Sequence, residues 1–158
     1  MSLGCCSIRR RLADLSEAAR SVGQRITVLN ASHEEDFEGA FAAAVQQRVV
    51  ALLISDDLFF GSRTEHLAAL AISHRLPAIS ISRSFTAAGG LISYGAVAGQ
   101  VYPQIGAYVG RILKGEKPAD LPILQTTKFE LVINLKTAKA LGLDVSNALQ
   151  LLADEVIE

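Results

Sequence analysis

The stretch Val49-Val50-Ala51-Leu52-Leu53-Ile54 decides the fold class that we predict for this chain. It is an unbroken apolar run of strand length, and such runs are typical of strands in a parallel sheet that helices cover on both faces. We therefore expect residues 49–54 to form the most buried strand. A polar loop follows at once, because a serine and two aspartates occupy positions 55–57.

Helical and strand patterns alternate on the N-terminal side of this run. Apolar residues recur at helical spacing between positions 8 and 22, and Gly23 follows where a left-handed cap belongs. A β-branched stretch predicts a strand over residues 25–30. The capping-box pattern from Ser32 to Glu35 then predicts a helix that continues to about Arg48.

The same alternation continues on the C-terminal side. A second capping box, from Ser62 to Glu65, predicts a helix that stops before Pro77. The patterns then predict strands at 78–82, 91–95 and 129–135, a helix at 100–114, and two short helices, one ending near Leu141 and one beginning near Ser146. Single helices between strands imply right-handed crossovers. The predicted fold class is therefore α/β, doubly wound, with a mostly parallel sheet.

The beginning of the chain does not fit this pattern. Folds of this class normally open on a strand inside the sheet, whereas this chain opens on a helical pattern. We treat residues 1–11 as an atypical N-terminal segment, either a makeshift strand or an artefact of the reading frame. The sheet is accordingly expected to lack its first strand.

Composition excludes several classes of protein. The 158 residues fit one domain, and with 50% hydrophobic and 20% charged residues the chain is too apolar for a disordered segment. No apolar run reaches the roughly 20 residues that a membrane-spanning helix needs. The net charge is -1 and the basic residues are mostly dispersed, which argues against nucleic acid as a partner. The adjacent Cys5 and Cys6 are expected to be free thiols, and no export signal precedes them.

The candidate site lies where two strands end. Ligands of open parallel sheets bind beyond the carboxyl ends of the strands, because the loops there converge. Asp56, Asp57 and Phe60 follow the first apolar strand, and Arg83 and Phe85 follow the next. They offer carboxylates for an ammonium, a guanidinium for a carboxylate, and rings for an apolar body. The alternative is a purely structural role, in which the aspartates are solvated loop residues and Phe85 is a core residue.

Enzymatic and metal chemistry have weaker support. The pair Asp56-Asp57 lacks the additional aspartate and lysine that a magnesium-dependent phospho-acceptor site would want. Ser62 and His66 lie close to Asp56 in sequence, but no third group is placed to orient the histidine. The three histidines have no zinc-site spacing, and no phosphate-binding glycine motif is present. We expect no catalytic residues, no metal and no cofactor, so the chain is predicted not to be an enzyme.

Two strings in the C-terminal half carry a family resemblance. They are Arg-Ile-Leu-Lys-Gly-Glu-Lys-Pro-Ala-Asp-Leu-Pro at 111–122 and Ile-Asn-Leu-Lys-Thr-Ala-Lys-Ala-Leu-Gly at 133–142, followed by Ala-Asp-Glu-Val-Ile at 153–157. With these strings the chain resembles ABC transporter substrate-binding proteins of the tryptophan/tyrosine-binding type, which have the type I periplasmic-binding-protein fold. The resemblance implies two α/β lobes that close around a small solute.

The resemblance implies an assignment for each part of the chain. Residues 12–158 correspond to the second lobe without its first strand, and residues 93–115 to a stretch that normally packs on the first lobe. The family's ligand loops are matched by Asp57, Phe60, Arg83 and Phe85. Ser93 and Tyr94 begin the stretch that normally packs on the first lobe. Ser84 replaces the usual glutamate, and Ser80 and Ser82 stand where aromatic residues are common. The sequence therefore does not predict which solute is bound.

The resemblance also implies partners and a location. The expected partners are a small organic solute such as an amino acid, bound in an interlobe cleft, and an ABC permease, in the periplasm. A ligand-sensing regulatory module is the alternative function, and a small hydrolase is a weaker one. Because unpaired edges and a helix without its lobe expose apolar surface, we also expect a homodimer or other self-association.

Overall fold

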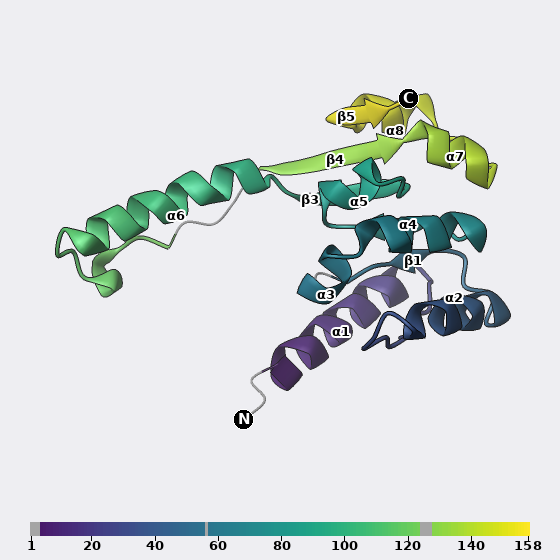
Figure 1. Cartoon of the computed structure of the whole chain (residues 1–158), viewed down its shortest axis with the longest axis horizontal. Helices are drawn as coiled ribbons and strands as arrows, with labels where there is room; N and C mark the ends of the chain where they lie inside the picture. Colours follow the sequence, from purple (N-terminus) through teal and green to yellow (C-terminus); the bar gives the residue numbers. More distant parts are fainter. Residues whose placement is uncertain (1–3, 56, 124–127) are drawn as a thin grey trace. The chain divides into compact units, whose positions relative to one another are not determined.

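The computed structural model describes residues 4–55, 57–123 and 128–158. The chain divides into two compact units, Met1–Ala40 and Phe41–Glu158. The second unit contains the sheet and therefore carries the candidate site (Figure 1).

The first unit begins with helix α1 (Gly4–Ser21), and Gly23 adopts the predicted left-handed conformation with φ +70°. Residues 4–11 belong to this helix and form no strand, and residues 1–3 lie outside the described residues. The predicted strand at 25–30 is wrong, because the segment pairs with no strand among the described residues. Ile26 and Val28 stay exposed there. A β-branched stretch becomes a strand only when a ladder satisfies its backbone groups.

Helix α2 (Asp36–Gln46) begins three residues later than the capping box predicted. The Asp36 carboxylate accepts hydrogen bonds from the backbone N–H groups of Ser32 (2.8 Å) and His33 (2.9 Å). These two hydrogen bonds lower the pKa of Asp36, and the bond from His33 has the larger effect. The predicted pairing of Ser32 with Glu35 is therefore wrong, because Asp36 closes this turn.

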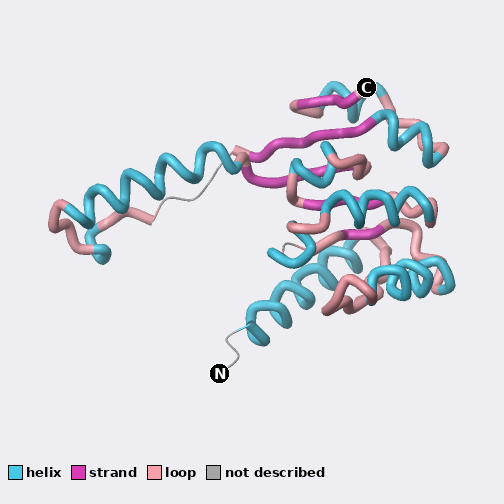
Figure 2. Tube along the Cα trace, in the orientation of Figure 1, coloured by secondary structure: helices cyan, strands magenta, loops and turns pink. Residues whose placement is uncertain are grey.

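The second unit is built on a five-stranded sheet in the order β1-β2-β3-β4-β5 (Figure 2). Its strands are β1 (Leu52–Leu53), β2 (Ala78–Ser80), β3 (Ile92–Ala96), β4 (Phe129–Asn134) and β5 (Glu155–Ile157). The pairs β1–β2, β2–β3 and β4–β5 are parallel, and β3–β4 is antiparallel. The predicted α/β class with a mostly parallel sheet is confirmed.

Strand β1 differs from its prediction. It is the last strand at one edge of the sheet and not the most buried one, since Val50 is 78% exposed and Leu53 54%. The fully buried side chains on the described strands include Val132 and Ile133 of β4 and Ser93 of β3. The apolar run did predict a strand, but its burial depends on neighbours that the sequence of the run does not contain.

Helices connect these strands. They are α3 (Leu58–Gly61), α4 (Thr64–Ser73), α5 (Arg83–Ala87), α6 (Ala98–Leu113), α7 (Leu135–Leu141) and α8 (Asn147–Leu152), with a 3-10 turn at Pro118–Asp120. The predicted capping box of α4 is wrong, because the Ser62 hydroxyl donates to the Phe59 carbonyl (2.9 Å) and Arg63 precedes the helix. Helices α3 and α5 and strand β5 were not predicted, because each is only three to five residues long.

Helix α5 lies against the middle of the sheet, where it contacts β2, β3 and β4. Its Phe85 and Thr86 are fully buried. Phe85 packs so closely over Gly90 that a Cβ at position 90 would overlap its ring. Helix α5 is therefore part of the core of the second unit, and it follows the end of β2 where the candidate site begins.

Gly95 of β3 marks a second close approach. A Cβ at this position would overlap the backbone carbonyl oxygen of Ile81, and a backbone group cannot swing aside as a flexible side chain can. We predict that Gly95→Ala lowers the free energy of unfolding by about 1–3 kcal/mol, as measured by urea denaturation.

Gly106→Ala is the matched control for this prediction. Gly106 lies in α6, and the place that a Cβ would occupy there has no neighbouring atom within 4 Å. Alanine at this position is therefore expected to leave stability unchanged or raise it by up to about 1 kcal/mol. Equal effects of the two substitutions would contradict the close approach at Gly95.

Candidate functional site

A cavity opens at the carboxyl ends of β1 and β2. Its volume is about 290 Å³ with its mouth included. The parallel pairing of Leu53 with Ile79 brings both strand ends to the same edge of the sheet, so the loops that follow them face each other. The lining residues are Ile54, Ser55, Asp57, Phe60, Gly61, Thr64, Leu67, Ser80, Ile81, Ser82 and Phe85.

The lining combines apolar side chains with short hydroxyl groups. Phe60, Leu67 and Phe85 supply apolar surface, while Asp57 contributes the one carboxylate among the described lining residues. Hydroxyl groups come from serines at 55, 80 and 82 and from Thr64. A mostly apolar wall with a few polar groups is typical of small-molecule sites. This volume includes open solvent at the mouth, so the cavity is a shallow hollow and not an enclosed site, as expected for one wall of a cleft.

The loop after β1 is held by its own polar groups. The Asp57 carboxylate accepts a hydrogen bond from the Phe59 N–H (2.7 Å) and so caps α3. The Arg63 guanidinium lies 4.3 Å from the centre of the Phe59 ring and donates to the Phe59 carbonyl (3.2 Å). These contacts fix the turn that carries Phe60 to the cavity.

The other wall of the cavity is fixed through the end of α5. The buried Asn134 side chain donates to the Thr86 carbonyl (3.2 Å) and accepts from the Thr137 N–H (3.0 Å). The Thr137 hydroxyl donates to the Gly89 carbonyl (2.8 Å). Asn134 therefore caps α7 and at the same time ties α5, with its Phe85, to β4.

The structure brings together three of the seven predicted site residues. Asp57 caps α3, Phe60 lies in α3 and Phe85 lies in α5, and all three line the cavity. Phe85 is also a buried core residue, so it lines the cavity and belongs to the core at the same time. Asp56 lies outside the described residues.

The other three predicted residues lie outside the cavity lining. Arg83 forms an ion pair with Glu155 of β5. Ser93 is buried in the row of β2, β3 and β4 residues that also holds Ser80 and Val132, and its hydroxyl has no hydrogen-bond partner among the described residues. Tyr94 is half-exposed and stacks on Phe129, with ring centroids 5.7 Å apart.

The prediction missed several lining residues that share one property. Ser55, Thr64, Ser80 and Ser82 are small hydroxyl residues at the ends of β1 and β2 or the start of α4. The strand-end rule that selected the aspartates and aromatics applies to them as well. Serine is so common in turns that its type carried no signal by itself.

The described part of the chain offers neither a metal site nor a membrane-spanning helix. Among those residues, no three His, Cys, Asp or Glu side chains come together as a metal site would require. No described helix combines the length and the apolar character needed to cross a membrane.

Comparison with known proteins decides the family. The model of the family described as ABC transporter substrate binding protein matches residues 7–157. The chain belongs to this family. Its members are binding proteins and not enzymes, which agrees with the prediction made from the sequence.

Solved structures of the same fold add a comparison of length. A conserved domain protein from Vibrio cholerae is 23% identical with a TM-score of 0.83, over 94% of this chain and 50% of that one. A domain in complex with L-Trp from Streptococcus pneumonia is 21% identical with a TM-score of 0.84, again over 94% and 50%. The ligand-free, open form of a substrate-binding protein with adhesive properties from Clostridium difficile is 17% identical with a TM-score of 0.68, over 99% and 52%.

The chain thus spans about half the length of the solved structures that it matches. Single-lobe length agrees with the fold, since one sheet and its helices account for the second unit. A comparison with curated proteins gives no match.

The Asn134 network generates a test of how the site wall is held. We predict that Asn134→Ala lowers the free energy of unfolding by about 1–3 kcal/mol, because the cap of α7 is lost and buried backbone groups lose a partner. Ser146→Ala removes only the exposed cap of α8, where the Ser146 hydroxyl accepts from the Leu149 N–H (3.3 Å), and should cost about 0.5–1 kcal/mol. Urea denaturation of both variants checks this order, and a larger loss for Ser146→Ala would contradict it.

Proposed function

We propose that this chain acts as the second lobe of a substrate-binding protein for an ABC importer. In this proposal the cavity at the ends of β1 and β2 is one wall of a cleft for a small organic solute such as an amino acid. The observation that carries it is the convergence of Asp57, Phe60 and Phe85 on one cavity at the carboxyl edge of the sheet. Membership of the family supports the class of function.

The predicted side chains divide the contacts with an amino-acid-like solute. Asp57 would pair with an ammonium group, while Phe60 and Phe85 would contact the apolar body. Arg83 keeps Nη1 without a hydrogen bond to the described residues, so this nitrogen would meet a carboxylate. Ser93 and Tyr94 lie before α6 in the chain, and their contact with the solute stays a prediction. The same holds for Asp56.

We also propose that α6 docks on a companion lobe. Four apolar residues, three or four positions apart, form a stripe along one side of α6, and each is at least 41% exposed: Tyr102, Ile105, Val109 and Ile112. An exposed apolar stripe of this size on one helix is unusual for a surface that faces only solvent. The length comparison supports a lobe as its occupant, because half of each matched structure has no counterpart here.

The complete receptor would deliver its solute to an ABC permease. Family members work in the periplasm or outside the cell, and we propose the periplasm for this protein.

The first test concerns affinity. A cleft with one wall leaves its solute half solvated, so we predict that this chain alone binds the common amino acids weakly or not at all. Isothermal titration calorimetry checks this, with the expected dissociation constants in the millimolar range or weaker. Micromolar binding by the isolated chain would contradict the proposal that a second lobe completes the site.

The second test concerns self-association, for which two apolar surfaces are suited. One is the stripe on α6. The other is the β1 edge, where Val50 and Leu53 are exposed and residues 49–54 include no charge, whereas β5 at the opposite edge begins with Glu155. Charged edges resist edge-to-edge pairing and uncharged ones favour it.

We predict that the chain forms dimers or larger assemblies at high concentration. Ile105→Lys with Val109→Lys, or Leu53→Lys, should shift the mass measured by light scattering toward the monomer. Leu151→Lys on α8 is the matched control, since Leu151 is 86% exposed and lies on neither surface. A clean monomer of the unaltered chain, or an equal effect of Leu151→Lys, would contradict the prediction.

A further inference from the structure

We propose that Arg83 is a positioning residue of the cavity, which holds the Ser82–Phe85 turn in place by binding Glu155 and Glu130 across the sheet. This inference rests on the proposed function only in giving the cavity its purpose. The contact joins the loop after β2 to the C-terminal strand, 72 residues away in the sequence.

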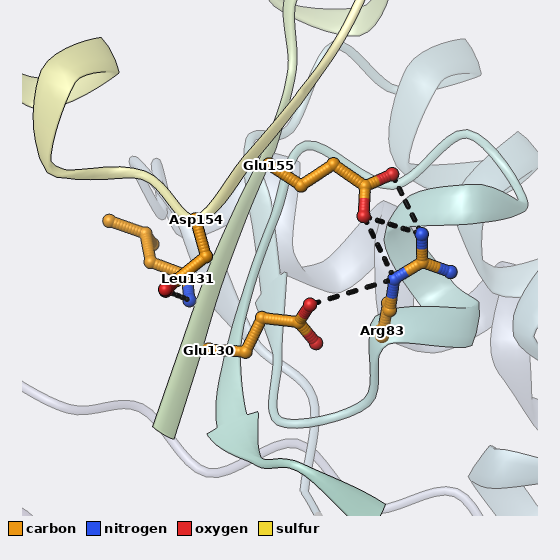
Figure 3. A network of polar contacts seen from close by, with 5 residues as sticks. All are labelled: Arg83, Glu130, Leu131, Asp154 and Glu155. Atoms are coloured by element: carbon orange, nitrogen blue, oxygen red, sulfur yellow. Dashed lines mark hydrogen bonds and ion pairs between the residues drawn. The ribbon is translucent and has the colours of Figure 1, made fainter. Parts of the chain in front are cut away.

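The geometry of the ion pair is well defined (Figure 3). Arg83 donates from Nε to one oxygen of Glu155 (3.1 Å) and from Nη2 to the other (2.7 Å). Glu130 lies on the same side, with its Oε1 3.9 Å from Nε. The hydrogen bond to Glu155 and the charges of Glu155 and Glu130 raise the pKa of Arg83, a side chain that is always cationic in proteins.

The Glu130 and Glu155 carboxylates lie on two paired strands, β4 and β5. Asp154 donates its N–H to the Leu131 carbonyl (2.9 Å), and its carboxylate accepts from the Leu131 N–H (2.8 Å). These two bonds extend the ladder between β4 and β5 by one residue, directly before Glu155 (Figure 3). Asp154, directly before β5, therefore bonds to β4, and Glu155, the first residue of β5, binds Arg83.

The residues beside Arg83 depend on this anchor. Ser82 lines the cavity immediately before Arg83, and Phe85 lines it two residues after. Helix α5 is only five residues long and its first turn has no side-chain cap, because the Ser82 hydroxyl bonds to that of Ser84 (2.8 Å). The far end of α5 is tied to β4 by Asn134. The ion pair supplies the corresponding tie at its near end.

Magnitude decides whether such a pair matters. Half-exposed ion pairs between single side chains contribute little to stability, and both the Arg83 and Glu155 side chains are partly exposed. Two features set this pair apart: the bonding is bidentate and a second carboxylate joins it. We therefore expect a local effect on α5 and not a large loss of global stability.

The test is amide hydrogen exchange, read by mass spectrometry on peptides that cover residues 81–88, in the 158-residue chain. Arg83→Gln and Glu155→Gln should each speed exchange in this segment by about fivefold, and the double variant should add little more. Arg83→Lys keeps the positive charge but cannot bind a carboxylate through two nitrogens. It should therefore protect residues 81–88 better than Arg83→Gln and less well than the unaltered chain.

Arg111→Gln is the matched control. Arg111 forms an equally close bidentate pair with Glu116 at the end of α6, and its removal should leave residues 81–88 unchanged. The free energy of unfolding is measured for every variant, so that local loosening is separated from global loss. If Arg83→Gln does not fold, Glu155→Gln alone decides the outcome.

Unchanged exchange at 81–88 in Glu155→Gln, additive effects in the double variant, or the same change in Arg111→Gln would each overturn the proposal. No solute enters the measurement. A failure here therefore leaves the solute site untouched, and a failure of the solute site would leave this result standing.

Discussion

Parallel pairing of β1 with β2 is the constraint on which the site depends. Because the two strands run in the same direction, their polar ends leave the sheet at one edge, and the loops that follow build a single cavity. An antiparallel pair would have sent Asp57 and Phe85 to opposite edges. The antiparallel β4 then brings Glu130 to the same edge as the ends of β2 and β3, which is why Arg83 can reach it.

Short helices at this edge convert the strand ends into a shaped wall. Neither α3 nor α5 is long enough to be stable by itself, since isolated helices need roughly a dozen residues or more. Each depends on side chains that tie it down: Asp57 and Arg63 for α3, and Asn134, together with the contact proposed for Arg83, for α5. Local contacts therefore hold α3, whereas α5 is held by residues distant in sequence.

The sequence predicted what periodicity and local rules control. Long amphipathic helices such as α6, the strands β2 to β4 and the α/β class follow from spacing alone. The burial of residues 49–54 did not follow, because it depends on which strands lie beside β1, and residues 25–30 remained unpaired for the same kind of reason. The strand-end rule placed Asp57, Phe60 and Phe85 at the cavity, but no local pattern reveals that Glu155 meets Arg83.

The most direct test of the account is to locate weak binding by NMR. Single amino acids at tens of millimolar are titrated into the isotope-labelled chain, and amide shifts are followed residue by residue. The account predicts that the shifts cluster at Ser55, Asp57, Phe60 and Ser82 around the cavity. Shifts that cluster elsewhere, for example over α7 and α8, would contradict the claim that the strand ends of β1 and β2 form the solute site.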